Sequence, residues 1–189
     1  MTTLQGRKLS MINIMENTMN PGKTKLFLMI AAFATLCAIS QVSLSVGNLS
    51  VIKEVNLNAS PDTVWKMVGG YNGLDVWHPV VVGSKLKSGN GIKPGDVREL
   101  SLGNGEKITE KLVIYSDDKK TYTYAITESP LPVMDYVSTI TVTESDNGMS
   151  KVEWSSTFNA NNATDEKAIE AITGVYDAGL NNLAKHFNQ

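Results

Sequence analysis

The sequence of 189 residues has few of the cysteines and histidines that form metal centres and disulfide frameworks. It contains one cysteine, Cys37, and two histidines, His78 and His186, which are far apart along the chain. One cysteine cannot form a disulfide within the chain, and zinc sites need three or four ligands held close together. A phosphate-binding loop, a dinucleotide fingerprint and a nucleophile elbow are absent as well. We therefore expect no metal and no cofactor.

Runs of basic residues are also absent. The chain has 17 Lys and Arg against 19 Asp and Glu, which gives a net charge of −2. Four of the basic residues but only one acidic residue lie in the first forty positions, so residues 41–189 carry 13 basic and 18 acidic side chains. An acidic domain without a basic run is a poor partner for nucleic acid or for an anionic membrane surface. We expect neither as a partner.

The first forty residues are typical of a targeting segment. Lys23 and Lys25 precede an uncharged, largely apolar run of 14 residues over positions 26–39. This run is shorter than the roughly 20 residues that a transmembrane helix needs, and it has the length of the apolar region of a secretory signal. The small residues Ala38 and Ser40 predict cleavage after Ser40, with a cut near Ser45 as the alternative.

This pattern predicts a signal peptide over residues 1–40, with its start at Met1 or Met19, a linker over 41–49 and one domain over 50–189. The protein is then periplasmic or secreted. An uncleaved leader that anchors the domain is the alternative, and it would be the only membrane contact. After cleavage the domain has no cysteine, so it would not depend on disulfides in an oxidising compartment.

Apolar periodicity predicts the order of the elements. Alternation predicts a strand over 51–58, and Ser60 with Pro61 begins a short helix. A second short helix ends at Trp77-His78, because the residue before Pro79 is pushed out of the helical region. Six further strands are expected near 80–86, 96–102, 106–115, 121–128, 136–144 and 151–158. The last helix follows the cap Thr164 and carries an apolar stripe of Ile169, Ile172, Tyr176, Leu180, Leu183 and Phe187.

One strand, two short helices, six strands and a long helix predict an α+β fold of the helix-grip type, β-α-α-β6-α. In this fold a curved seven-stranded antiparallel sheet wraps around the C-terminal helix, whose stripe is buried on the concave side. Gly174 and Gly179 lie in that helix, where each costs up to about 1 kcal/mol relative to Ala. They either leave space for a cavity or allow close packing against a bulky sheet residue such as Trp154.

Strand alternation also predicts a charged pair inside the sheet. Arg98 shares its strand face with Leu100 and Leu102, and Glu110 shares its face with Ile108, Leu112 and Ile114. A three-residue hairpin loop, Gly103-Asn104-Gly105, pairs Leu102 with Glu106 and places Arg98 directly opposite Glu110. A two-residue loop would set apolar faces against polar ones, so the three-residue loop is favoured.

The same alternation directs aromatic and apolar side chains inward on the following strands. These are Tyr122, Tyr124, Ile126, Tyr136, Ser138, Ile140, Val142, Val152, Trp154 and Phe158. The result is an apolar chamber that holds a small polar group of Arg98, Glu110, Tyr124 and Tyr136, which is typical of a ligand site. The alternative is a structural ion pair that braces the sheet beneath the helix.

Two further segments are candidates for function. His78 lies where it could reach a cavity mouth, and its ordinary pKa near 6.5 would suit proton transfer; the alternative is a surface or capping histidine. Residues 128–134 contain two prolines and apolar side chains. They predict a semi-rigid lid, a contact surface or a plain strand connection.

The ordered motifs resemble the polyketide cyclase/dehydrase branch of the START-like (SRPBCC, pollen-allergen-like) superfamily from about residue 50 to the end. They are Trp77-His78-Pro79, Gly95-Asp96-Val97-Arg98, Glu110-Lys111-Leu112, Tyr122-Thr123-Tyr124, Pro130-Leu131-Pro132-Val133, Asp135-Tyr136, Val152-Glu153-Trp154, Gly174-Val175-Tyr176 and Ala178-Gly179-Leu180. Within that branch, the leader and the late helix are similar to exported MxaD-type proteins associated with bacterial methanol oxidation. That resemblance implies an exported accessory protein with a protein partner.

A more distant resemblance is to the plant lachrymatory factor synthase. Its catalytic arginine and glutamate match Arg98 and Glu110, and a tyrosine matches Tyr136, although that enzyme lacks the Trp77-His78-Pro79 string. This resemblance implies a polar site at the same place in the cavity.

Three functional hypotheses follow. The first is binding of a small apolar or amphipathic ligand, with contacts expected from Trp77, His78, Arg98, Glu110, Tyr124, Tyr136, Trp154 and Tyr176. The second is a cofactor-independent lyase, isomerase or cyclase. In it Glu110 moves a proton, Arg98 stabilises an oxyanion, Tyr136 or Tyr124 orients the substrate and His78 is a second acid or base. The third places function on the outer surface, with the cavity filled.

Overall fold

The computed structural model describes residues 47–189, so the predicted signal peptide and most of the predicted linker lie outside the described residues. Within residues 47–189, no helix is both long and apolar enough to cross a membrane. The elements in chain order are β1 (Leu49–Leu57), α3 (Pro61–Val68), α4 (Leu74–Trp77), β2 (Val81–Ser88), β3 (Val97–Leu102), β4 (Lys107–Ser116), β5 (Thr121–Glu128), β6 (Val133–Glu144), the 3-10 turn η1 (Asp146–Gly148), β7 (Ser150–Ala160) and α5 (Asp165–Phe187). Apart from η1, this is the predicted order.

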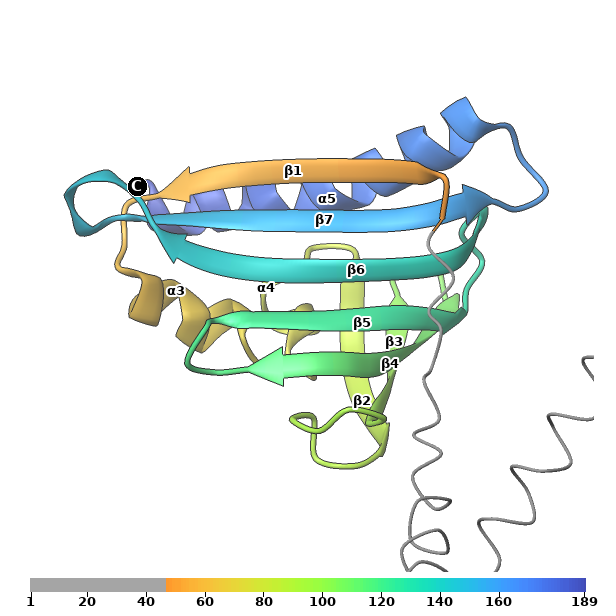
Figure 1. The fold of residues 1–189 in the computed structure, drawn as a ribbon, viewed down its shortest axis with the longest axis horizontal. Coiled ribbons are helices and arrows are strands. Elements are labelled where there is room, and N and C mark those ends of the chain that lie inside the picture. The colour runs from red at the N-terminus through yellow and green to blue at the C-terminus, as the bar shows by residue number, and fades with distance from the viewer. Residues whose placement is uncertain (1–46) are drawn as a thin grey trace, which may run out of the picture. The chain divides into compact units, whose positions relative to one another are not determined.

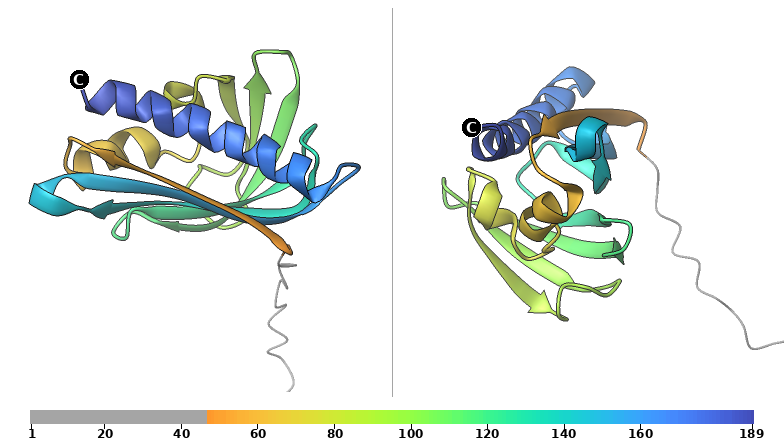
Figure 2. Two further views of the ribbon diagram at one scale, coloured as in Figure 1. Left: turned by 90° about the horizontal axis from the view of Figure 1, so that it is seen from above. Right: turned by 90° about the vertical axis from the view of Figure 1, so that its left-hand side faces the viewer.

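The seven strands form one antiparallel sheet in the order β1-β7-β6-β5-β4-β3-β2. The sheet is curved, and α5 crosses its concave side against β1 and β7, while α3 and α4 lie within the same hollow (Figures 1 and 2). The predicted helix-grip fold is therefore confirmed.

Local sequence explains the helix boundaries. The Ser60 side chain accepts a hydrogen bond from the Thr63 amide, and Thr164 does the same for Lys167, so both predicted caps are confirmed. In α5 the stripe residues Ile172, Tyr176, Leu180 and Leu183 are buried. Ile169, the fifth residue of α5, remains 36% exposed, so the predicted stripe is not buried at the start of the helix.

One inward prediction is wrong. Ile114 was expected on the same inner face as Glu110 and Leu112, but its side chain is 54% exposed. The pairing of β4 with β5 shifts by one residue between Leu112 and Ile114, and such a bulge reverses the side-chain alternation beyond it. Beyond the bulge the inward position passes to Tyr115, which pairs with the buried Tyr122 and packs against the core.

The loop between β2 and β3 is held by one carboxylate. Asp96 Oδ2 accepts hydrogen bonds from four successive backbone amides, those of residues 90–93, at 2.7–3.1 Å. These bonds stabilise the ionised form and lower the pKa of Asp96. Because Asp96 precedes β3 directly, this loop fixes the start of the strand that carries Arg98.

Candidate functional site

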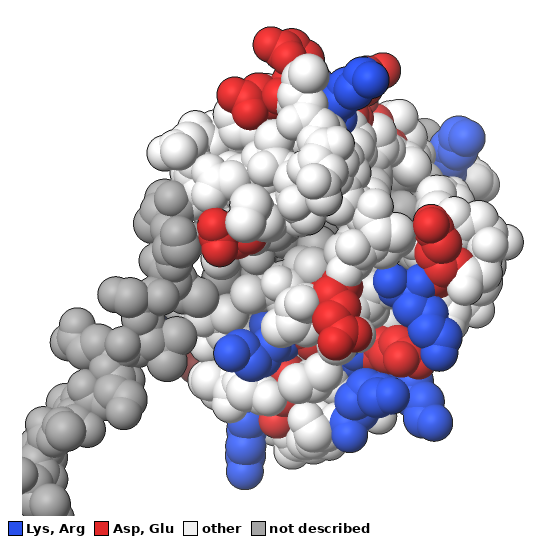
Figure 3. Space-filling view, turned by 90° about the vertical axis from the view of Figure 1, so that its right-hand side faces the viewer, with Lys and Arg blue, Asp and Glu red and all other residues white. Residues whose placement is uncertain are grey.

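A cavity of about 230 Å³ lies between α5 and the concave side of the sheet. Most of its wall is apolar, and the segment that joins β5 to β6 contributes Pro130, Leu131 and Pro132. Figure 3 views the end of the molecule where β5 leads into β6 and shows a hollow bordered largely by uncharged side chains. The other lining residues are Leu74, His78, Val80, Val81, Leu100, Leu102, Asn104, Glu106, Ile108, Glu110, Tyr124, Ile126, Tyr136, Trp154, Ile172 and Val175. The segment predicted as a lid or connection thus forms part of the cavity wall.

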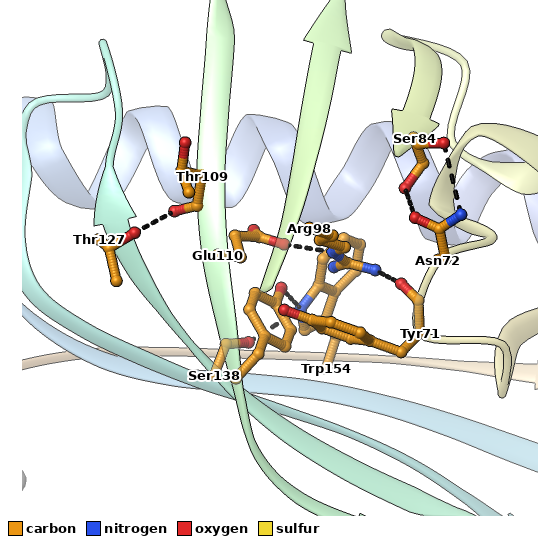
Figure 4. A network of polar contacts seen from close by, with 10 residues as sticks. Tyr71, Asn72, Ser84, Arg98, Thr109, Glu110, Thr127, Ser138 and Trp154 are labelled. Atoms are coloured by element: carbon orange, nitrogen blue, oxygen red, sulfur yellow. Dashed lines mark hydrogen bonds and ion pairs between the residues drawn. The ribbon is translucent and has the colours of Figure 1, made fainter. Parts of the chain in front are cut away.

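Arg98 and Glu110 are direct cross-strand partners on β3 and β4, as the hairpin argument predicted. The Leu102 amide donates to the Glu106 carbonyl at 2.9 Å, which closes the three-residue loop. Arg98 Nε donates to Glu110 Oε2 at 2.6 Å, and both side chains are almost fully buried (Figure 4). The pair is therefore a desolvated, charge-assisted hydrogen bond.

Arg98 has further partners behind the cavity wall. Its Nη1 donates to the Tyr71 carbonyl, in the turn between α3 and α4 (Figure 4). The guanidinium carbon lies 4.3 Å from the centre of the Tyr71 ring and 5.2 Å from that of Tyr124, distances at which cation–π attraction is appreciable. Within the described part of the chain, Nη2 has no hydrogen-bond partner. Arg98 does not line the cavity, so it reaches a ligand only through Glu110.

Glu110 is a buried carboxyl in the cavity wall. Burial raises the pKa of its carboxyl, and the Arg98 guanidinium opposes that shift. We expect the carboxyl to keep its proton to a higher pH than an exposed glutamate does. A carboxyl of this kind can donate a hydrogen bond or transfer a proton to a bound molecule.

A hydroxyl chain forms a second polar group. The Tyr136 and Tyr176 hydroxyls are 2.6 Å apart, and the Tyr176 hydroxyl is 2.9 Å from Ser138 Oγ. Burial raises the pKa of Tyr176 to about 12 and that of Tyr136 well above its ordinary value. Both phenols are therefore protonated at neutral pH.

Trp154 connects this chain to Tyr124. Its indole Nε1 donates to the Tyr124 hydroxyl at 3.1 Å and to Ser138 Oγ at 3.0 Å. The indole ring also stacks on Tyr176, with ring centres 4.3 Å apart. The aromatic wall is thus positioned by both stacking and hydrogen bonds.

His78 lies in the wall but has both ring nitrogens engaged. Nε2 is 2.9 Å from the Val175 carbonyl, and the Val80 amide donates to Nδ1 at 3.3 Å. A carbonyl only accepts, so these partners assign the proton to Nε2 and leave Nδ1 as an acceptor. Burial lowers the pKa of His78, which favours this neutral form. The imidazole therefore joins the end of α4 to α5, and its predicted role as an acid or base stays a prediction.

The structure brings most of the predicted site residues together around one cavity. Its wall includes His78, Glu110, Tyr124, Tyr136 and Trp154. Trp77, Arg98 and Tyr176 are not in the wall: Trp77 packs edge-on against Trp154, while Tyr176 and Arg98 contact wall residues. They can therefore act on a ligand only through their neighbours.

Sequence reasoning missed Tyr71 and underrated Ser138. Tyr71 is buried, but it lies in an irregular turn, where no alternation indicates direction. An aromatic residue directly after Gly69-Gly70 was the only signal in the sequence. Ser138 was predicted to face inward, but its place at the centre of the hydroxyl chain depends on side-chain contacts that alternation does not reveal. Residues 47–189 contain no group of three His, Cys, Asp or Glu side chains that could hold a metal ion.

Comparisons with known proteins agree with this architecture. The family model described as polyketide cyclase / dehydrase and lipid transport matches residues 49–188. The structure of the protein XoxI from Bacillus cereus is similar, with 38% identity and a TM-score of 0.70, over 74% of this chain and 96% of that one. An uncharacterised protein from Bacillus thuringiensis shares 37% identity with a TM-score of 0.70, over 75% of this chain and all of its own. A structure from Thermobifida fusca shares 26% identity over 72% of this chain and 91% of its own, with a TM-score of 0.66.

No protein with a curated description matches the chain. The family model nevertheless covers nearly all of the described residues, and two solved structures exceed 35% identity over almost their full length. The chain therefore belongs to the polyketide cyclase / dehydrase and lipid transport family.

Proposed function

We propose that the domain binds a small, largely apolar molecule in the cavity beneath α5, with the Glu110 carboxyl at its polar end. The observation that supports this most strongly is the contrast within the wall, where a buried carboxyl lies among mainly apolar side chains. A core without a ligand role would fill such a space, because protein interiors are close-packed. The hypothesis of a filled cavity with function only on the outer surface has no such support.

Ligand binding should raise thermal stability. A ligand at a hundred times its dissociation constant stabilises the folded state by about 2.7 kcal/mol, which moves the melting temperature by several degrees. We expect this shift with small apolar ketones or phenols, measured by thermal unfolding across a compound panel.

A matched pair of variants tests where the compounds bind. Val175→Phe enlarges a side chain in the cavity wall and should reduce the shift, whereas Val76→Phe makes the same change at an exposed valine and should preserve it. Equal shifts in both variants would place binding outside the cavity.

The raised pKa of Glu110 also supports a second candidate, cofactor-independent proton transfer as in a lyase, isomerase or cyclase. In this reaction Glu110 removes a proton from the carbon beside a carbonyl group and returns it to the same or another carbon. Arg98 holds the carboxylate in place, and the wall excludes water.

Proton transfer can be tested without knowing the substrate. In deuterated water, the protein should accelerate deuterium exchange beside the carbonyl of a bound ketone, followed by NMR. Glu110→Gln should lower the rate by at least about 100-fold, because positioned acid–base groups contribute about that much, while circular dichroism stays unchanged. Full exchange in this variant would remove Glu110 as the group that moves the proton.

We further propose that the domain is exported and assists an exported redox system together with a protein partner. The apolar run in the predicted leader and the resemblance to MxaD-type proteins support this proposal. Cell fractionation should recover a mature protein that begins at Gln41; a full-length protein in the membrane fraction would indicate the anchor instead. Neighbouring genes for methanol oxidation would favour the accessory role, and their absence would count against it.

A further inference from the structure

The direction of each hydrogen bond in the hydroxyl chain follows from Ser138. Ser138 Oγ lies 2.8 Å from the Ser155 carbonyl oxygen, and a carbonyl cannot donate. The single hydroxyl proton of Ser138 therefore lies between these two oxygens. Ser138 Oγ must accept its other two hydrogen bonds, from Trp154 Nε1 and from the Tyr176 hydroxyl. This uses both of its lone pairs.

The hydroxyl proton of Tyr136 is also used, in a hydrogen bond to Tyr176. Tyr176 donates to Ser138, so the 2.6 Å contact between the two tyrosine hydroxyls holds the proton of Tyr136. The reverse direction would leave the oxygens of Ser138 and Tyr176 2.9 Å apart without a proton between them. Tyr136 lines the cavity, yet it offers a ligand only a lone pair.

Tyr124 differs from Tyr136, because its hydroxyl accepts a hydrogen bond but has no acceptor for its own proton within the described residues. Its oxygen accepts from Trp154 Nε1 at 3.1 Å, and among residues 47–189 no group accepts its own hydroxyl proton. The residue lines the cavity wall beside Glu110, because Leu112 pairs with Tyr124 and Glu110 pairs with the next inward residue, Ile126. A buried donor without an acceptor is costly, so a bound oxygen would satisfy it.

We infer that Tyr124, and not Tyr136, donates the hydrogen bond that selects a ligand with a carbonyl oxygen. This inference rests on the proposed ligand-binding function and adds the chemical class that the cavity prefers. Tyr136 is then a positioning residue, which holds Tyr176 in place through its committed proton.

The test compares two probes that differ only at the acceptor, 2-acetylnaphthalene and 2-ethylnaphthalene, in the wild-type protein and in Tyr124→Phe and Tyr136→Phe. Both variants should fold, because Trp154 keeps its bond to Ser138 in the first and Tyr176 keeps its bond to Ser138 in the second. The wild-type protein should prefer the ketone about tenfold, the size of one net hydrogen bond. Infrared spectra should show the carbonyl stretch of the bound ketone at lower frequency.

Tyr124→Phe should abolish both the preference and the infrared shift, while binding of the hydrocarbon persists. Tyr136→Phe should change both affinities by the same factor and so retain the preference. Loss of the preference in Tyr136→Phe, or its retention in Tyr124→Phe, would overturn the inference while leaving ligand binding intact. If the wild-type protein binds neither probe nor any other apolar compound, the proposed function itself fails.

Discussion

Replacing Arg98 by methionine is expected to lower the free energy of unfolding by about 3–5 kcal/mol, because it leaves the Glu110 carboxyl buried without its partner. The guanidinium is fully buried, and it also donates to the Tyr71 carbonyl in the turn between α3 and α4. Its removal therefore affects both the ion pair and the docking of the turn. Denaturant unfolding monitored by circular dichroism measures the loss.

The double variant Arg98→Met with Glu110→Leu is the matched control. Replacing a whole buried ion pair by apolar side chains is often neutral or stabilising, so this protein should recover most of the lost stability. Its preference for an apolar ketone over the matching hydrocarbon should persist, since Tyr124 is unchanged. If Arg98→Met alone lowers the free energy of unfolding by less than about 1 kcal/mol, the buried Glu110 carboxyl does not need Arg98 as its partner.

Gly179→Ala is expected to lower the free energy of unfolding by about 1–3 kcal/mol, the usual cost of overpacking. A Cβ at this position would lie 2.7 Å from His78 Cδ2 and 3.0 Å from both Trp77 and Trp154. These rings belong to a buried cluster whose contacts leave them little room to move. The substitution should therefore shift α5 away from these rings.

Gly174→Ala provides the matched control on the same helix. Its Cβ would meet nothing within 4 Å, so the better helix propensity of alanine should raise stability by up to about 1 kcal/mol. The two variants should thus change stability in opposite directions in thermal or denaturant unfolding. Equal effects would contradict the role of Gly179 in close packing, the second of the two explanations that the sequence left open.

The sequence predicted those parts of the site that follow from strand alternation and loop length. Arg98 and Glu110 face each other because the apolar neighbours of both residues and a three-residue loop agree on one register. Alternation failed at Ile114, where a bulge that no residue pattern marks reverses the side-chain directions. The inner face was therefore predictable only as far as the pairing stayed regular.

Other features of the site depend on three-dimensional contacts alone. Tyr71 lies in a turn, where neither helical nor strand periodicity indicates direction, so its carbonyl contact with Arg98 was not foreseen. The sequence placed Tyr124 and Tyr136 on the same wall but could not distinguish them. Only the distances around Ser138 assign their protons.

A crystal structure of the protein with 2-acetylnaphthalene tests the central claim most directly. We predict that the naphthalene lies in the cavity beneath α5 and that its ketone oxygen is within hydrogen-bond distance of the Tyr124 hydroxyl, close to Glu110. A ligand bound only on the outer surface, with the cavity closed by its own side chains, would contradict the account.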